Sequence, residues 1–189
     1  MKFIKKITRR WSMAGIICES DEDVYEYGIE LFIFTIINIS VILGSAVFIG
    51  RSLDGIALIT VILPLQSFGG GYHAKTHLRC FLIMYIGWWV VVFLLPFITS
   101  IAAIFMSSAA MFIIFWLAPV ANENVKMSFN QRLKMQKMVR IVAMVSLVSA
   151  FVFLFLQERV GIAMSTGLGI VSFSMLAAHW KNALEKASV

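Results

Sequence analysis

Two histidines and a cysteine lie within eight positions of a chain that offers few other groups for nucleophilic chemistry. His73, His77 and Cys80 directly follow the glycine run from Gly69 to Gly71. The whole chain holds three histidines and two cysteines in 189 residues. An imidazole exchanges a proton near neutral pH, and a thiolate is an effective nucleophile. The cluster therefore favours an enzyme.

Helical spacing leaves the roles of the two histidines open. On an uninterrupted helix His77 and Cys80 are i, i+3 neighbours, whereas His73 lies about 10 Å from Cys80 along the helix axis. The glycine run permits a bent path that would bring His73 to the thiol. The same three side chains would also suit zinc, so a zinc-dependent membrane enzyme using His73, His77 and Cys80 is an alternative.

Cys80 stands at the beginning of an apolar segment. The positive end of a helix dipole at such a position favours a thiolate, and Arg79 adds a neighbouring cation. A single cysteine is more often a small apolar filler, but a cluster of ionisable groups at a membrane boundary is typical of function. Cys18 has no such surroundings, and we expect it to be a bystander.

The composition is that of an integral membrane protein. Hydrophobic residues make up 60% of the chain, charged residues 14%, and the mean hydropathy is +0.90. Soluble domains are about 45–50% apolar and about 25% charged. The sequence therefore predicts an all-α, polytopic fold with about six transmembrane segments and an N-terminal amphipathic helix.

Uncharged windows give the expected spans, each tested against the length that crosses a bilayer. They cover residues 31–50, 55–72, two spans within 80–122, then 141–157 and 160–178. The second span is short, and Pro64 and the glycines make a tilted, broken or re-entrant helix possible there. Pro96 with Thr99 and Ser100 predicts the turn between the third and fourth spans.

The basic residues sort to one side of this arrangement. With the N-terminus inside, 14 of the 16 fall on the cytoplasmic side, and only Arg51 and Arg159 lie outside. The positive-inside bias favours this orientation, and it explains the net charge of +6 without nucleic acid as a partner. We expect a multi-pass protein of the cell membrane with both termini and the His/Cys cluster on the cytoplasmic side.

The chain reads as a single membrane-embedded domain, residues 1–189, with three notable parts. Residues 1–28 form an N-terminal cytoplasmic segment whose apolar and basic residues alternate at helical spacing, as in an interfacial helix or a simple basic anchor. Residues 66–80 hold the catalytic loop and the start of a helix. Residues 122–140 form a basic cytoplasmic segment with a helical pattern.

The motif from Gly70 to Ala74, with a cysteine seven positions after its histidine, resembles the accessory gene regulator B (AgrB) family. These bacterial membrane cysteine endopeptidases process quorum-sensing propeptides. The resemblance extends to the chain length, the basic N-terminus, the six-segment hydropathy and the step from Ala118 to Pro119. It implies that Cys80 is the nucleophile and that His73 is its base.

The resemblance also assigns supporting positions around the loop. It implies that Gly71 is structurally required, with Gly69 and Gly70 in the same loop and His77 in a secondary role. The family often has a basic residue seven positions before the catalytic histidine, where this chain has Gln66. Gln66 would supply a hydrogen bond there instead of a cation.

For the substrate, the resemblance implies a short amphipathic propeptide with an acidic C-terminal tail (AgrD-like). The thiolate would release that tail through an acyl-thioester and permit cyclisation to a thiolactone or lactone, with no metal or other cofactor. The candidate tail-binding residues are Lys126, Arg132, Lys134 and Lys137. The same basic residues would equally serve as topology determinants or bind anionic membrane lipid.

Several further expectations accompany this interpretation. A homodimer is implied, and the small residues from Gly161 to Gly169 would allow one. Asn122, Glu123 and Asn124 are candidates to orient the imidazole of His73. A small transporter and a non-catalytic scaffold are the remaining alternatives; a transporter would be expected to carry ionisable groups near mid-span, whereas this cluster lies at one boundary.

Overall fold

The computed structural model describes residues 2–72, 77–120 and 128–187, and regular secondary structure in those ranges is entirely helical. The α-helices are α1 (Lys2–Met13), α2 (Glu22–Phe48), α3 (Ser52–Gly69), α4 (His77–Leu94), α5 (Ser100–Leu117), α6 (Phe129–Leu156) and α7 (Glu158–Ala187). Two 3-10 helices, η1 (Glu19–Asp21) and η2 (Leu95–Phe97), join them. Six of the helices are long and apolar enough to cross a membrane, which confirms the expected all-α polytopic fold.

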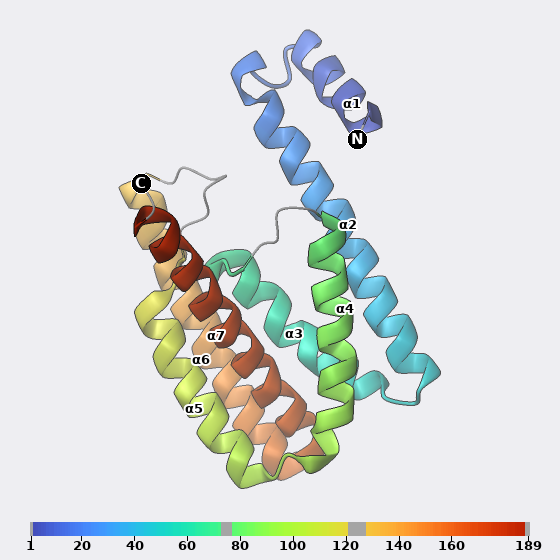
Figure 1. Ribbon diagram of the computed structural model, residues 1–189, viewed down its shortest axis with the longest axis vertical. Coiled ribbons are helices and arrows are strands. Elements are labelled where there is room, and N and C mark those ends of the chain that lie inside the picture. The colour runs from blue at the N-terminus through green and yellow to red at the C-terminus, as the bar shows by residue number, and fades with distance from the viewer. Residues whose placement is uncertain (1, 73–76, 121–127, 188–189) are drawn as a thin grey trace.

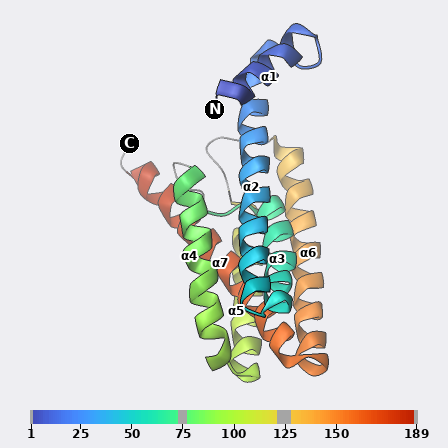
Figure 2. The ribbon, with the colours of Figure 1, turned by 90° about the vertical axis from the view of Figure 1, so that its right-hand side faces the viewer.

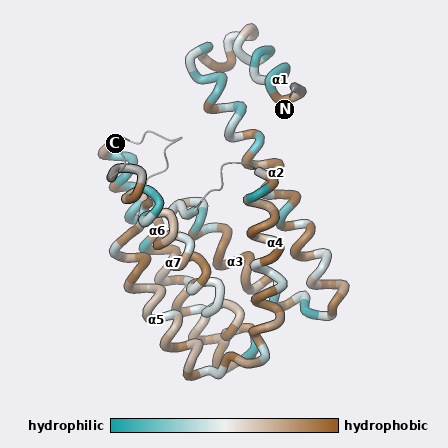
Figure 3. Tube along the Cα trace, viewed as in Figure 1, coloured by the Kyte–Doolittle hydropathy of each residue, from teal (hydrophilic) through white to brown (hydrophobic). Residues whose placement is uncertain are grey.

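Successive long helices run in opposite directions and so define two ends of the molecule (Figure 1). At the end that we call the loop end, α3 finishes at Gly69 and α4 begins at His77. At the far end, α3 begins at Ser52 and α7 begins at Glu158. Hydrophilic segments gather at α1 and the loop end, whereas the helices between the two ends are mostly hydrophobic (Figure 3).

Helix α7 is the centre of the bundle and packs against α3, α5 and α6. All residues from 161 to 168 are buried. A Cβ atom on Gly167 would lie 3.2 Å from the Cβ of Val61, and one on Gly169 would lie 3.1 Å from Met106. The expectation that these small residues provide a homodimer face is therefore wrong, because they serve close packing within one chain.

Helices α2 and α4 form a looser second layer. Helix α4 packs on α2, and α2 in turn packs on α3. Only 11% of the span window of α2 and 17% of that of α4 are buried, against 67% for α7. Because their exposed side chains are mostly apolar, these two helices present the broadest lipid-facing surfaces of the molecule.

The second span is short but not broken. Helix α3 continues through Pro64 and covers 18 residues, which corresponds to about 27 Å at 1.5 Å per residue and falls just short of a hydrocarbon core of about 30 Å. It ends where Gly70 adopts a φ of +69° and donates its N–H to the carbonyl of Gln66 at 3.0 Å. Glycine reaches such a positive φ without steric cost.

Two side-chain caps set the beginnings of α5 and α6. The hydroxyl of Thr99 accepts the Ala102 N–H at 3.3 Å, which confirms the expected turn after Pro96. Ser128 and Gln131 form a reciprocal capping box, with bonds of 2.9 and 3.3 Å. As a result, the described part of the basic segment 122–140 is the beginning of α6 itself, continuous with the fifth span.

The N-terminal segment forms the expected amphipathic helix. Helix α1 lies beside the first turns of α2, beyond the loop end of the bundle (Figure 2). Ile4 and Thr8 are buried at 1% exposure, and Lys5 lies 3.8 Å from Glu26. Phe3 on the same helix is 73% exposed, so α1 keeps an apolar side chain available for a membrane surface.

Candidate active site

The segment that follows α5 holds the first part of the glycine loop. The Val120 N–H donates to the carbonyl of Gly69 at 2.9 Å. A Cβ atom on Gly70 would lie 2.9 Å from the carbonyl oxygen of Val120. Val120 is buried at 6% exposure, so its carbonyl has little space to move away from an added Cβ atom. Only glycine fits at position 70, by its φ and by the space around it.

Helix α7 holds the second part of the loop. The Tyr72 N–H donates to the hydroxyl oxygen of Ser174 at 3.0 Å. A Cβ atom on Gly71 would lie 2.7 Å from the same oxygen. A Cβ atom on Gly69 would in turn run into the side chain of Met175. The loop from Gly69 to Tyr72 is thus held between the segment that follows α5 and one face of α7.

Cys80 lies in the first turn of α4, where its thiol is half-buried. This placement confirms that the cysteine opens a membrane-spanning helix. His73 and the side chain of His77 lie outside the described residues, as do Asn122, Glu123, Asn124 and Lys126. Gln66 is half-buried in the last turn of α3, one turn before the loop, and its carbonyl accepts the Gly70 N–H.

The basic residues at the start of α6 divide into two kinds. Arg132, Lys134 and Lys137 are exposed at the loop end. Arg140 instead donates to the carbonyl of Phe115 at 3.4 Å and lies 5.3 Å from the centre of that ring. Because Phe115 belongs to the last turn of α5, Arg140 binds a carbonyl left open at a helix end and holds α6 to α5.

Among the described residues, no group of three His, Cys, Asp or Glu side chains is arranged to hold a metal ion. The zinc alternative depends on His73 and His77, whose side chains fall outside that part of the chain. Within the described residues, the features that could take part in catalysis are the Cys80 thiol and the glycine loop that is held in place.

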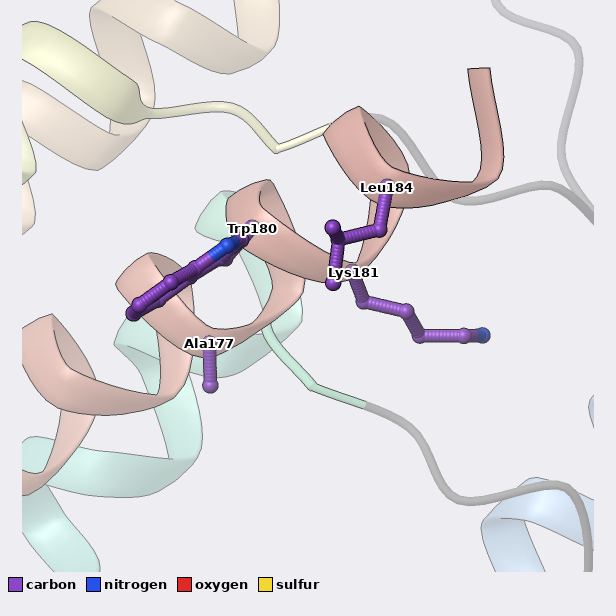
Figure 4. A pocket seen from close by; sticks show the side chains of 4 residues that line it. All are labelled: Ala177, Trp180, Lys181 and Leu184. Atoms are coloured by element: carbon purple, nitrogen blue, oxygen red, sulfur yellow. The ribbon is translucent and has the colours of Figure 1, made fainter. Parts of the chain in front are cut away.

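Two surface hollows lie elsewhere. One, of about 480 Å³, is lined by Ala177, Trp180, Lys181 and Leu184 on the C-terminal part of α7 (Figure 4). The other, of about 500 Å³, lies at the far end, where Arg51, Asp54 and Arg159 contribute to its lining. Neither of these two hollows includes Cys80 or the glycine loop.

The far end holds polar contacts that the sequence analysis missed. Asp54 is 2% exposed and accepts hydrogen bonds from Arg159 at 2.8 and 3.1 Å. Arg51 donates to the carbonyl of Val92 at 2.8 Å, and Ser100 donates to Glu158. A signal was available, because a lone acid in the apolar second span needs a cation, and the only two basic residues outside were Arg51 and Arg159.

The contact between Tyr72 and Ser174 was missed as well. The two residues are 102 positions apart, and Ser174 is one of several hydroxyl residues in the last span. No spacing rule in the sequence separates it from its neighbours.

The fold and the loop together define a class: a polytopic helical membrane protein in which a clamped glycine loop leads into a helix that opens with a cysteine. The family model described as Accessory gene regulator B matches residues 2–177, and the chain belongs to that family. Membership supports a role in processing quorum-sensing propeptides and implies an AgrD-like propeptide as partner. No curated protein and no solved structure is similar enough to this chain to count as a match.

Proposed function

We propose that this protein is a membrane cysteine endopeptidase that removes the C-terminal tail of a quorum-sensing propeptide. The observation that carries the proposal is the clamped loop from Gly69 to Tyr72, which ends immediately before His73, together with Cys80 in the first turn of α4. A helix N-terminus favours the thiolate form of a cysteine. The loop is held up to Tyr72, the residue directly before His73, which is the proposed base.

The reaction begins with Cys80 and His73. The imidazole takes the thiol proton, and the thiolate sulfur attacks the carbonyl carbon of the scissile peptide bond. His73 returns the proton to the departing amine as the C–N bond breaks, and the acidic tail leaves. The N-terminal part of the propeptide is then held on Cys80 as an acyl-thioester.

The propeptide itself resolves the thioester. A cysteine thiol or serine hydroxyl of the substrate attacks the acyl carbon, its proton passes to the Cys80 sulfur through His73, and the macrocycle leaves as a thiolactone or lactone. A site at a membrane boundary, away from bulk water, favours this transfer over hydrolysis.

The glycine loop offers a donor for the oxyanion. The N–H of Gly70 is bonded to Gln66 and that of Tyr72 to Ser174. Within the described loop, the N–H of Gly71 carries no hydrogen bond. A backbone N–H that is already fixed in place stabilises developing charge without reorganisation, so Gly71 is our candidate donor.

The loop end belongs on the cytoplasmic side in this proposal. The described residues place the basic residues of α1 and of the first turns of α6 at the same end as Cys80, and Arg51 and Arg159 at the opposite end. The positive-inside bias then orients the molecule. A propeptide made in the cytoplasm reaches the site without crossing the membrane.

Cleavage by reconstituted protein tests the proposal. Purified chain in lipid vesicles is mixed with a propeptide that has an amphipathic N-terminal helix and an acidic tail, and tail release is followed by mass spectrometry. We expect release with the unaltered chain and with Cys18→Ala, and none with Cys80→Ala or His73→Ala. Equal release by the Cys80→Ala and Cys18→Ala variants would rule out the thiol mechanism.

A further inference from the structure

Ser174 differs from the hydroxyl residues around it on α7 in what it binds. The hydroxyl of Ser172 donates to the carbonyl of Gly169, and that of Thr166 donates to the carbonyl of Ile162, so both bonds stay within the helix. The Ser174 oxygen instead accepts the N–H of Tyr72, which belongs to a segment 102 positions earlier. Ser174 therefore holds another part of the chain.

Ser174 lies beside the packed face of α7. Val171 and Met175 on the same helix are fully buried at 0% exposure, and Ala178 one turn further on is 6% exposed. Ser174 is itself half-buried, and the side chains next to it on this face of α7 are close-packed against the rest of the bundle. The Ser174 hydroxyl can therefore hold the glycine loop against the bundle.

The glycine loop that Ser174 holds needs to be fixed in place. Three successive glycines have wide backbone freedom, and the loop has two attachments that remove it. The first is the bond from Val120 to Gly69 at the start of the loop. The second is the bond from Tyr72 to Ser174 at its end, one residue before His73. Without the second attachment, the direction in which the chain leaves Tyr72 would no longer be set.

We propose that Ser174 is a positioning residue, which fixes the Tyr72 amide and thereby delivers His73 to Cys80. The inference rests on the proposed function, because the direction of the loop matters to the chemistry only if His73 acts on the Cys80 thiol. Ser174 itself touches neither the substrate nor the reacting atoms in this account.

The test uses the reactivity of Cys80 in the absence of substrate. In a Cys18→Ala chain reconstituted in vesicles, the rate of alkylation by iodoacetamide is measured across pH, since the thiolate is the reactive form. The variants are Ser174→Ala, Ser174→Thr and His73→Ala. Ser172→Ala is the matched control, because it removes a hydroxyl from the same helix without touching the loop.

We expect Ser174→Ala to move the alkylation profile to higher pH, toward that of His73→Ala, and to lower kcat for propeptide cleavage by about 10- to 100-fold with little change in KM. Ser174→Thr keeps the hydroxyl and should restore both readouts. Ser172→Ala should match the parent chain in both. A loss of folding alone would not shift the pH profile while leaving KM in place.

Two results would overturn the inference, and they are distinguishable. If His73→Ala shifts the profile and abolishes cleavage while Ser174→Ala matches the parent, Ser174 has no positioning role and the proposed function stands. If His73→Ala leaves the profile unchanged and cleavage intact, the proposed function fails and the inference fails with it.

Discussion

Gly70 and Gly71 each have an obstacle within 3 Å of where a side chain would begin. The obstacle at position 70 is a backbone carbonyl, that of Val120, and the obstacle at position 71 is the hydroxyl that holds the loop. Gly44 and Gly87, by contrast, face open space within 4 Å. At the residue scale, the loop therefore requires glycine at both positions, whereas Gly44 and Gly87 leave room for a side chain.

Gly70→Ala and Gly71→Ala should both reduce propeptide cleavage by about 10- to 100-fold, because either Cβ displaces the loop that carries the base. The loss should be greater for Gly70→Ala, since its φ of +69° adds strain and Val120 is buried. Gly87→Ala, in an open position of α4, serves as the control.

The control has its own expected result. Gly87→Ala should leave cleavage unchanged and raise helix stability by about 0.5–1 kcal/mol, because alanine loses less backbone entropy than glycine. Cleavage rates and thermal unfolding of the three variants in detergent provide the comparison. Activity of Gly70→Ala equal to that of Gly87→Ala would refute a rigid loop.

At the scale of elements, the basic residues of α6 differ in their surroundings. Arg140 holds the end of α5, whereas Arg132, Lys134 and Lys137 have exposed side chains at the loop end. The capping box at Ser128 and Gln131 starts the helix before these residues, so that their spacing is helical and fixed. We propose that the exposed cations capture the acidic tail of the propeptide.

Replacing Lys134 and Lys137 with Gln should raise KM for the propeptide about two- to tenfold at low salt, since each exposed ion pair contributes about 0.2–1 kcal/mol. The difference in KM should shrink as the salt concentration rises, because salt also screens the attraction between the parent's lysines and the acidic tail. The measurement is cleavage kinetics across a salt series.

Lys6 and Arg9 provide a matched pair for this experiment. Both are exposed on α1 at the same end of the molecule, so Lys6→Gln with Arg9→Gln removes the same charge from another element. This pair should leave KM close to that of the parent. An unchanged KM for the α6 pair, or an equal rise for both pairs, would remove the docking role and favour lipid binding or topology.

At the scale of the whole molecule, polar contacts tie the far end together. Asp54 joins the start of α3 to the start of α7 through Arg159, and Arg51 reaches the last turns of α4. Helix α4 packs on α2, and at the loop end the glycine loop bonds to Val120 after α5 and to Ser174 of α7. The contacts at the far end therefore tie α3, α4 and α7 together.

Arg159→Gln should destabilise the fold more than Asp54→Asn. The Arg159 variant leaves the Asp54 carboxylate, at 2% exposure, without its cation, whereas the Asp54 variant removes the buried charge. The expected loss for Arg159→Gln is about 1–3 kcal/mol. Thermal unfolding in detergent measures both. The reverse order of the two variants would show that the buried carboxylate is stabilised in another way.

Much of this architecture follows from the sequence in physical terms. A membrane requires about 20 apolar residues per crossing, so uncharged windows predict the spans, and Pro96 with Thr99 predicts the turn between α4 and α5. The grouping of Cys80 behind a glycine run also predicts a loop at a helix start. Such signals are local, and a single sequence carries them well.

Other features depend on packing that no local pattern encodes. The basic residues after Ser128 suggested a separate segment, but a capping box and good helix formers make them one helix with the fifth span. The small residues near Gly167 suggested a dimer face, whereas α3 and α5 occupy that face. Ser174 was undetectable because its partner lies 102 positions away.

The central claim is that the Cys80 sulfur carries the propeptide as a thioester, and mass spectrometry of the chain tests it most directly. The Cys18→Ala protein in vesicles is mixed with a propeptide whose cyclising cysteine or serine is replaced by alanine, so that the intermediate accumulates. We predict release of the acidic tail together with a mass increase, on the peptide that contains Cys80, equal to the acyl fragment. Tail release with Cys80 unmodified at every time point would contradict the account.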